Sequence, residues 1–184
     1  LTILEDVLAL LRVDSGQFAM SHAMHELSAA VDEALADVAV HARAQEVGIV
    51  DAVSNVTDGP RYWGDGQRVR QILVNLLTNA IKFTAPSGRV TITAGTSGPH
   101  ASVAGGGPWT FLRVEDTGRG IPPELIGTIF EPFNQTVLAD QDRGTGLGLS
   151  ISRQLARAMG GDITVSSRLG VGSTFTLWLV AEPE

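Results

Sequence analysis

Residues 65–84 read DGQRVRQILVNLLTNAIKFT, and this stretch predicts the central helix of the fold. Asp65 suits the N-cap position, because its carboxylate can accept hydrogen bonds from the first free backbone N–H groups. Pro86 and Gly88 follow and predict the end of the helix. The apolar residues recur every three or four positions and form one stripe, made of Val69, Ile72, Leu73, Leu76, Leu77, Ala80 and Ile81. We therefore expect one face of this helix to lie on the core.

The same helix carries a polar face beside the stripe. Asn75, Asn79 and Lys82 are spaced by four and three residues, so they share this face. Amide oxygens can ligate Mg²⁺, and an ammonium group binds phosphate oxygens, so the trio suits a Mg²⁺–phosphate group. An ordinary solvated polar face would show the same pattern, and both interpretations stay open at this point.

The neighbouring segments predict helices and strands in mixed order. Helices are expected over 27–46 and 147–159, and an edge strand over 17–25. Further strands are expected over 47–53, 61–64, 90–94, 109–115, 163–167 and 173–180. Residues 95–108 resemble the tip of a hairpin, and the long, mostly irregular stretch 116–148 is typical of a functional lid. The pattern predicts an α+β fold: a two-layer sandwich with a mixed sheet covered on one face by three helices.

Two glycine-rich segments are candidates for ligand binding. DTGRGI (116–121) follows a predicted strand, where a carboxylate can accept a hydrogen bond from a ligand's amino group and glycines admit a flat ring. RGTGLGLSI (143–151) opens a predicted helix, whose N–H groups and dipole favour a polyphosphate. A plain turn and a flexible helix start are the alternatives. The spacing matches neither the dinucleotide fingerprint nor the P-loop, and no HRD or DFG motif is present.

Composition excludes several classes of protein. The 184 residues suffice for one domain, and the formal net charge of −7 argues against a general binder of nucleic acid or anionic membranes. The absence of cysteine excludes disulfides, Cys-ligated metals and thiol chemistry. No apolar run approaches the roughly 18 residues of a membrane helix. The chain begins at Leu1, and we expect it to be a piece of a longer protein.

Five motifs in this order resemble the ATP-binding catalytic domain of sensor histidine kinases. That domain belongs to the GHKL superfamily, together with gyrase B, MutL and the heat-shock chaperone ATPases. The motifs are NLLTNAIKFT (75–84), DTGRGI (116–121), FEPF (130–133), GTGLGL (144–149) and GVGSTF (170–175). Residues 1–16 resemble the end of the second helix of the dimerisation and phosphoacceptor hairpin. The resemblance thus implies a hairpin remnant over 1–16 and an ATP-binding domain of the Bergerat type over 17–184.

The resemblance implies a role for each motif residue. Asp116 would bind the adenine amino group, Thr174 would contact the adenine through water, and Asn79 would ligate Mg²⁺ with Asn75 nearby. Lys82 would reach phosphate, and residues 122–143 would form a mobile ATP lid anchored by Phe130 and Phe133. Arg143, where many relatives have Gly, is expected to contact phosphate, with a solvated lid arginine as the alternative. The remaining nucleotide-pocket residues are Gly118, Gly120, Ile121, Gly144, Thr145, Gly146, Leu147 and Gly148.

The implied reaction is phosphoryl transfer from ATP to a histidine. None of the histidines (His22, His25, His41 and His100) lies in the His-Glu context of the family's acceptor. The chain is therefore expected to bind ATP and ADP without phosphorylating itself. Asn75 stands where hydrolytic relatives place a Glu general base, and an amide cannot take a proton from water, so we expect very slow hydrolysis.

Partners follow from the same resemblance. The parent protein is expected to be a homodimer that passes phosphate to a response-regulator receiver domain, without nucleic acid as a partner. This domain is expected in the cytoplasm, whether or not the parent is membrane-anchored. Two alternatives stay open: a Ser/Thr-directed GHKL kinase, and a nucleotide-binding regulatory module without phosphoryl transfer.

Overall fold

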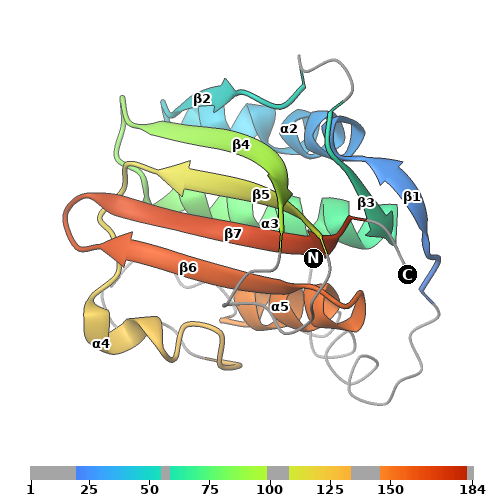
Figure 1. Ribbon diagram of the computed structural model, residues 1–184. Helices are drawn as coiled ribbons and strands as arrows, with labels where there is room; N and C mark the ends of the chain where they lie inside the picture. The colour runs from blue at the N-terminus through green and yellow to red at the C-terminus, as the bar shows by residue number, and fades with distance from the viewer. Residues whose placement is uncertain (1–19, 55–58, 99–107, 134–145, 182–184) are drawn as a thin grey trace.

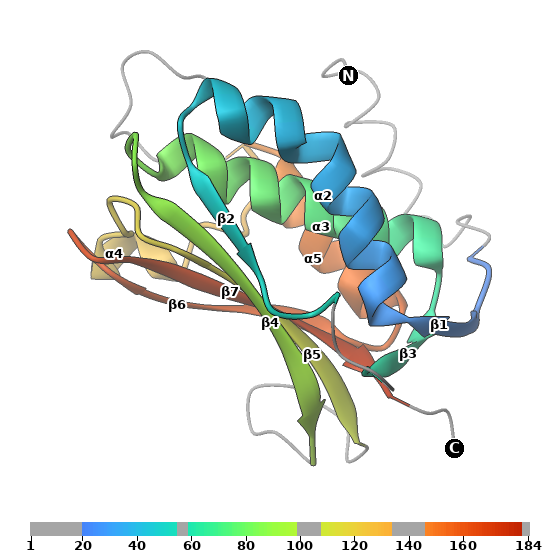
Figure 2. The same ribbon diagram turned by 90° about the horizontal axis from the view of Figure 1, so that it is seen from above.

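One mixed sheet with helices on a single face forms the protein. The computed structural model describes residues 20–54, 59–98, 108–133 and 146–181. Helices α2 (Leu27–Ala44), α3 (Gly66–Phe83) and α5 (Gly148–Ala158) lie together on one side of the sheet (Figures 1 and 2). This arrangement confirms the expected α+β class and its two layers. No helix among the described ranges is both long and apolar enough to cross a membrane.

The sheet has seven strands in the order β1-β3-β7-β5-β4-β2, and β6 also pairs with β7. β2 and β4 are parallel, whereas the other pairs are antiparallel, so the sheet is mixed as expected. β5 and β7 lie at its centre. The strands are β1 (Ala23–Glu26), β2 (Gly48–Asp51), β3 (Arg61–Gly64), β4 (Arg89–Ser97), β5 (Trp109–Asp116), β6 (Asp162–Arg168) and β7 (Gly172–Val180).

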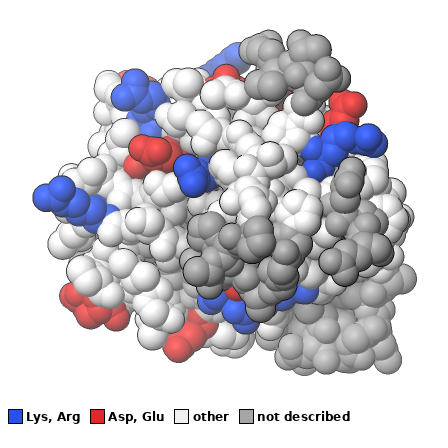
Figure 3. Space-filling view, in the orientation of Figure 1, with Lys and Arg blue, Asp and Glu red and all other residues white. Residues whose placement is uncertain are grey.

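Alternation along β5 and β7 divides their side chains between the two faces of the sheet. On the helix side, Leu112, Val114 and Phe175 join the main core. On the other side, Trp109 and Trp178 form a separate buried cluster. Figure 3, which faces this second side, shows positive and negative side chains interspersed rather than gathered by sign. The period of two places Asp116 and Ser173, which are paired in register, on the helix side.

Helix α3 forms as its sequence predicts. All seven residues of the apolar stripe are buried. The Asp65 carboxylate accepts a hydrogen bond from the Arg68 backbone N–H at 3.2 Å, which confirms the N-cap. The helix ends at Phe83, three residues before Pro86, and Thr84 is its C-cap. Helices α2 and α5 both contact α3, and the stripe belongs to the main core.

Some expected boundaries differ from those observed. The stretch 116–148, which is predicted to be mostly irregular, contains the short helix α4 (Pro123–Ile126). Asp116 is the last residue of β5 rather than the first after it, because both ladders of that strand continue to this residue. The expected hairpin remnant 1–16, residues 99–107 of the predicted hairpin tip and 134–145 of the expected lid region lie outside the described residues.

Candidate functional site

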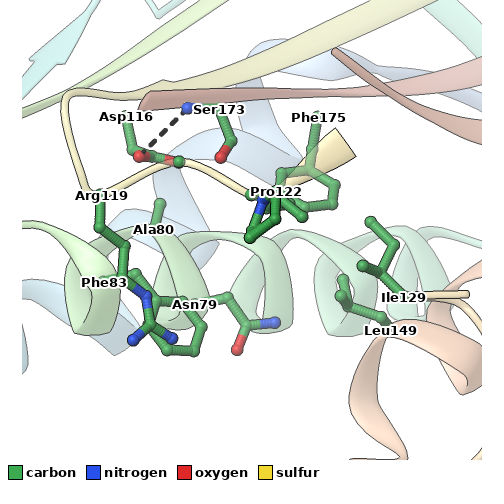
Figure 4. Close-up of a pocket in the computed structure, with 12 residues that line it drawn as sticks. Asn79, Ala80, Phe83, Asp116, Arg119, Pro122, Ile129, Leu149, Ser173 and Phe175 are labelled. Atoms are coloured by element: carbon green, nitrogen blue, oxygen red, sulfur yellow. Dashed lines mark hydrogen bonds between the residues drawn. The ribbon is translucent and has the colours of Figure 1, made fainter. Parts of the chain in front are cut away.

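A pocket opens between the sheet and the helices, at the end where β5 and β7 meet α3. The space between its walls is about 670 Å³, a figure that includes open solvent. Figure 4 shows side chains from the sheet and from α3 converging on it. The lining residues are Asn79, Ala80, Phe83, Asp116, Arg119, Gly120, Ile121, Pro122, Ile129, Leu149, Ser173 and Phe175.

Asp116 is the buried carboxylate of the pocket, with only 6% of its surface exposed. Its Oδ1 accepts hydrogen bonds from the backbone N–H groups of Gly118 at 2.8 Å and Ser173 at 3.3 Å. Burial raises the pKa of this carboxyl above its ordinary value, and the Glu115 charge adds to the rise. The two N–H donors oppose it, because they favour the ionised form. The arrangement holds an acceptor for a hydrogen-bond donor inside a mostly apolar pocket.

The loop after Asp116 is held tightly against both layers. The Arg119 N–H donates to the Phe83 carbonyl at 3.3 Å, and the Ile121 N–H donates to Oγ of Ser167 at 2.8 Å. Gly120 has φ of +70°, and a Cβ there would collide with the carbonyl of Arg168. Backbone packing therefore requires glycine at this position, whether or not a ligand with a flat ring binds in the pocket.

The three residues on the polar face of α3 have different neighbours. Asn79 lines the pocket, as expected. Asn75 lies one turn earlier, where its Nδ2 donates to Oγ of the buried Ser152 on α5 at 2.9 Å. A Cβ on Gly148 would collide with Oδ1 of Asn75, so glycine lets the first turn of α5 approach this amide. The Lys82 Nζ lies 5.3 Å from the centroid of the Phe83 ring.

Phe133, inside the expected lid 122–143, lies close to Gly146, which follows that lid in the chain. The Phe133 N–H donates to the carbonyl of Gly146 at 3.1 Å, which brings together the residues on either side of 134–145. Phe130 packs edge-on against Phe175, with the ring centroids 6.5 Å apart, and its role as an anchor of the lid stays a prediction. Phe133 itself is 64% exposed and does not contribute to the described lining of the pocket. Arg143, Gly144 and Thr145 lie outside the described residues.

The last motif places a different residue in the pocket from the one expected. Ser173 and Phe175 line it, whereas Thr174 is absent from its described lining. Thr174 lies between them on β7, so its side chain points to the other face of the sheet. Counting by twos from the core residue Phe175 would have identified Ser173. The pocket contributions of Phe83 and Arg119 were also missed, because neither residue lies on an apolar stripe that predicts its position.

Metal ligands are sparse at this site. Within the described ranges, no group of three or more His, Asp or Glu side chains could hold a metal ion. The amide oxygen of Asn79 is a suitable single ligand for Mg²⁺, which usually keeps several waters and takes phosphate oxygens. The donor set therefore fits a metal that enters together with a phosphorylated ligand, and does not fit a metal held by protein ligands alone.

The comparisons with known proteins agree with this geometry. The family model "Histidine kinase-, DNA gyrase B-, and HSP90-like ATPase" matches residues 64–183. The circadian input-output histidine kinase CikA of Synechococcus elongatus is 34% identical over 181 residues, which are 97% of this chain and 23% of that protein.

Solved structures give the same result. Full-length ShkA in complex with AMPPNP aligns with a TM-score of 0.78 and 31% identity, over 98% of this chain and 36% of that one. The catalytic domain of the histidine kinase ThkA aligns with a TM-score of 0.70 and 28% identity, over 88% of this chain and 97% of that one. The chain thus spans less than a quarter of the length of CikA. It belongs to the family of histidine kinase-, DNA gyrase B- and HSP90-like ATPases.

Proposed function

We propose that this chain binds Mg²⁺–ATP and donates the γ-phosphate to a histidine, as the catalytic domain of a sensor histidine kinase. The observation that carries the proposal is the buried carboxylate of Asp116 in a pocket between the sheet and the helices. Family membership supports an ATP-binding catalytic role. The alignment with ShkA, which was crystallised with the ATP analogue AMPPNP, supports the choice of nucleotide.

The adenine would lie at the Asp116 end. Both backbone donors bind Oδ1 of this carboxylate, and we assign Oδ2 to the amino group of the base. Ile121, Ile129 and Phe175 line the same pocket and would contact the flat faces of the ring. Selection of adenine follows from chemistry, because a carboxylate accepts a hydrogen bond from an exocyclic amine and repels a carbonyl oxygen.

The phosphates would lie toward Asn79 and the first turn of α5. Asn79 would supply an amide oxygen to Mg²⁺, which neutralises phosphate charge when bound. Gly146 and Gly148 stand where a helix N-terminus favours anions, and Leu147 between them is fully buried and fixes that turn in the core. The roles of Lys82, Arg143, Gly144 and Thr145 toward phosphate stay predictions.

The transfer step needs little chemistry from the protein. A neutral imidazole is already a nucleophile, so the domain would position ATP and balance its charge. Asn75 cannot act as a base toward water, and its amide is hydrogen-bonded to Ser152. Water attack would therefore be slow, so that the γ-phosphate is kept for the histidine.

The acceptor would come from elsewhere in the parent protein. None of the three described histidines lines the pocket: His22 lies beside Trp63, His25 beside Tyr62, and His41 on α2. We place the acceptor on a dimerisation hairpin, with the parent a homodimer that transfers phosphate to a receiver domain. We propose the cytoplasm as the compartment of this domain, because the proposed reaction needs ATP and a receiver domain there.

Calorimetric titration with a non-hydrolysable ATP analogue in Mg²⁺ tests the proposal. The wild-type chain is expected to bind, and Asp116→Asn is expected to bind at least roughly ten-fold more weakly, because it loses a charge-assisted hydrogen bond. Fusing the acceptor hairpin should then give acid-labile phosphohistidine. Absence of binding by the folded wild-type chain, or equal binding by the variant, would contradict the assignment of the base site.

A further inference from the structure

Both ends of the Asn75 amide, which comes from α3, lie against helix α5. Its Nδ2 donates to Oγ of Ser152 at 2.9 Å. Its Oδ1 lies so close to Gly148 that a Cβ at that residue would collide with it. Gly148 and Ser152 are one helical turn apart on the same face of α5. The amide therefore spans the first turn of α5, and Asn75 is not among the described residues that line the pocket.

This polar bridge adds direction to an apolar contact between the two helices. Leu147, Ile151 and Leu155 are buried and hold the start of α5 in the main core. Hydrophobic attraction is non-directional, so such packing alone tolerates small shifts of α5 along α3. A hydrogen bond weakens when its distance or angle changes. The bond between Asn75 and Ser152, which is only 3% exposed, therefore fixes where the first turn of α5 lies.

A second buried serine in the same helix turn makes a different contact. Ser150 is also 3% exposed, and its Oγ donates to the carbonyl of Leu147 at 2.8 Å. This bond stays within the start of α5, whereas the Ser152 hydroxyl accepts from a side chain of α3. Burial alone therefore does not explain the contact of Ser152, which joins two helices.

The start of α5 is also where we place the phosphates of the nucleotide. The first N–H groups of a helix have no partner within it, and the helix dipole favours an anion beside them. The base would be held on the sheet side by Asp116, so the distance from the base to these N–H groups depends on where α5 lies. A shift of α5 would loosen the phosphate contacts and leave the base contacts in place.

We propose that Ser152 is a positioning residue for phosphate binding: it holds the Asn75 amide, and this bridge keeps the first turn of α5 where its backbone N–H groups bind phosphate. The inference rests on the proposed ATP site and adds a residue outside the five motifs to it. Asn75 acts here on the helix, whereas Asn79 acts on Mg²⁺. Binding of the base stays with Asp116, so the two contributions are separable by mutation.

A double-mutant cycle tests whether the two residues act as one unit. The wild-type chain, Ser152→Ala, Asn75→Ala and the double variant are titrated with the ATP analogue and with adenosine in Mg²⁺, and NMR chemical shifts report both binding and folding. Each single variant should bind the ATP analogue roughly three- to ten-fold more weakly, the equivalent of one hydrogen bond. The double variant should bind it no more weakly than the weaker single variant, because both changes remove the same bridge. Adenosine affinity of Ser152→Ala should stay within about two-fold, since no base contact is lost.

Thr164→Val is the matched control. Oγ1 of Thr164 on β6 accepts from Nε1 of Trp178 on β7 at 2.9 Å, which is again a side-chain bond from an N–H to a hydroxyl between two elements. Thr164 lies outside the described lining of the pocket. Its replacement removes a bond of the same kind and length, and both affinities are expected to stay unchanged.

Gly148→Ala probes the other end of the bridge. The added Cβ would push the Asn75 amide away, so this variant should also bind the ATP analogue more weakly. Asn75→Ala removes the group with which the Cβ collides, and the variant with both changes should bind as well as Asn75→Ala alone. This pair keeps the proposal testable if Ser152→Ala or its double variant does not fold.

The outcomes separate the two proposals. Losses that multiply in the double variant would overturn the inference, since Asn75 would then act on the ligand independently of Ser152. Unchanged binding of the ATP analogue by Ser152→Ala would overturn it as well, and so would an equal loss of adenosine binding, which would mean a general loosening of the pocket. A folded wild-type chain that binds neither ligand would instead defeat the proposed ATP site, and the inference with it.

Discussion

The ionised carboxylate of Asp116 lowers the stability of the fold, yet it is the group that we expect to bind the ligand. Burial raises its pKa, so the folded state favours the protonated carboxyl more than the unfolded chain does. This contribution to stability is present at low pH and is lost as the pH rises from the ordinary value of 3.8 through the raised value. At neutral pH the ionised group therefore costs stability, and we attribute its presence to ligand recognition.

Asp116→Asn should for this reason be more stable than the wild-type chain at pH 7 while losing ATP binding. The variant keeps a side-chain oxygen for the N–H groups of Gly118 and Ser173 but carries no buried charge. Urea unfolding at pH 7 and near pH 4 checks the sign: the advantage of the variant should shrink toward the lower pH. A variant that is less stable at pH 7 would show that the ionised carboxylate stabilises the fold.

Ser173 and Thr174 offer a second comparison between single residues. Ser173 lines the pocket, and its Oγ lies 2.9 Å from Oγ of Ser167, whose hydroxyl also accepts the Ile121 N–H. Ser173→Ala should weaken binding of the ATP analogue by about five-fold, the equivalent of one hydrogen bond of ~1 kcal/mol. Thr174→Ala, on the other face of β7, should bind normally in the same calorimetric titration. The reverse order would restore the role first expected of Thr174.

Among the elements, α5 is joined to the sheet by ions and to the expected lid by an aromatic ring. Asp162 at the start of β6 accepts hydrogen bonds from Arg153 at 2.8 Å and from Arg157 at 3.2 Å. Burial opposes ionisation of Asp162, but these two arginines and the Ile163 N–H outweigh it, so its pKa is lowered. The Arg153 guanidinium also lies 4.5 Å from the centroid of Phe130. One carboxylate thus orients the arginine that contacts an anchor of the lid region.

Asp162→Asn should destabilise the chain by about 1–2 kcal/mol at pH 7, a moderate value because both arginines are partly exposed. A lowered folded pKa gives stability that is present above the ordinary value of 3.8 and is lost as the pH falls through the lowered value. Urea unfolding of both proteins should therefore converge in strong acid. A difference that persists there would assign the loss to packing instead of charge.

Prediction from sequence was most successful where periodicity carries the information. The stripe of α3 and strand β4 were predicted because burial imposes a regular spacing on apolar residues. Helix α4 has only four residues, too few for any stripe. Spacing placed Asn75 and Asn79 on one face, but their neighbours come from α5 and the sheet, so only the fold could show that Asn75 contacts Ser152. Arg119 stacks on Phe83 through a contact between separate elements, and spacing cannot predict such contacts.

For the molecule as a whole, the pocket lies where the two layers meet, so a ligand bound there contacts both. Asp116, Ser173 and Phe175 come from the central strands, whereas Asn79, Phe83 and Leu149 come from the helices. A ligand that binds only the folded chain stabilises it by RT ln(1 + [L]/Kd), which is about 2.7 kcal/mol at a hundred-fold excess over Kd. For a domain of this size, that corresponds to a rise in Tm of roughly 5–10 °C.

Thermal melting with Mg²⁺ and the ATP analogue should show this rise as a shift of one cooperative transition, because unfolding of either layer destroys the pocket. Asp116→Asn under the same conditions should show a clearly smaller shift, because weaker binding lowers [L]/Kd, and this comparison controls for nonspecific effects of nucleotide and salt. Two transitions of which only one moves would mean that the layers unfold separately. The ligand would then be held by one layer, and the assignment of base and phosphates to opposite layers would fail.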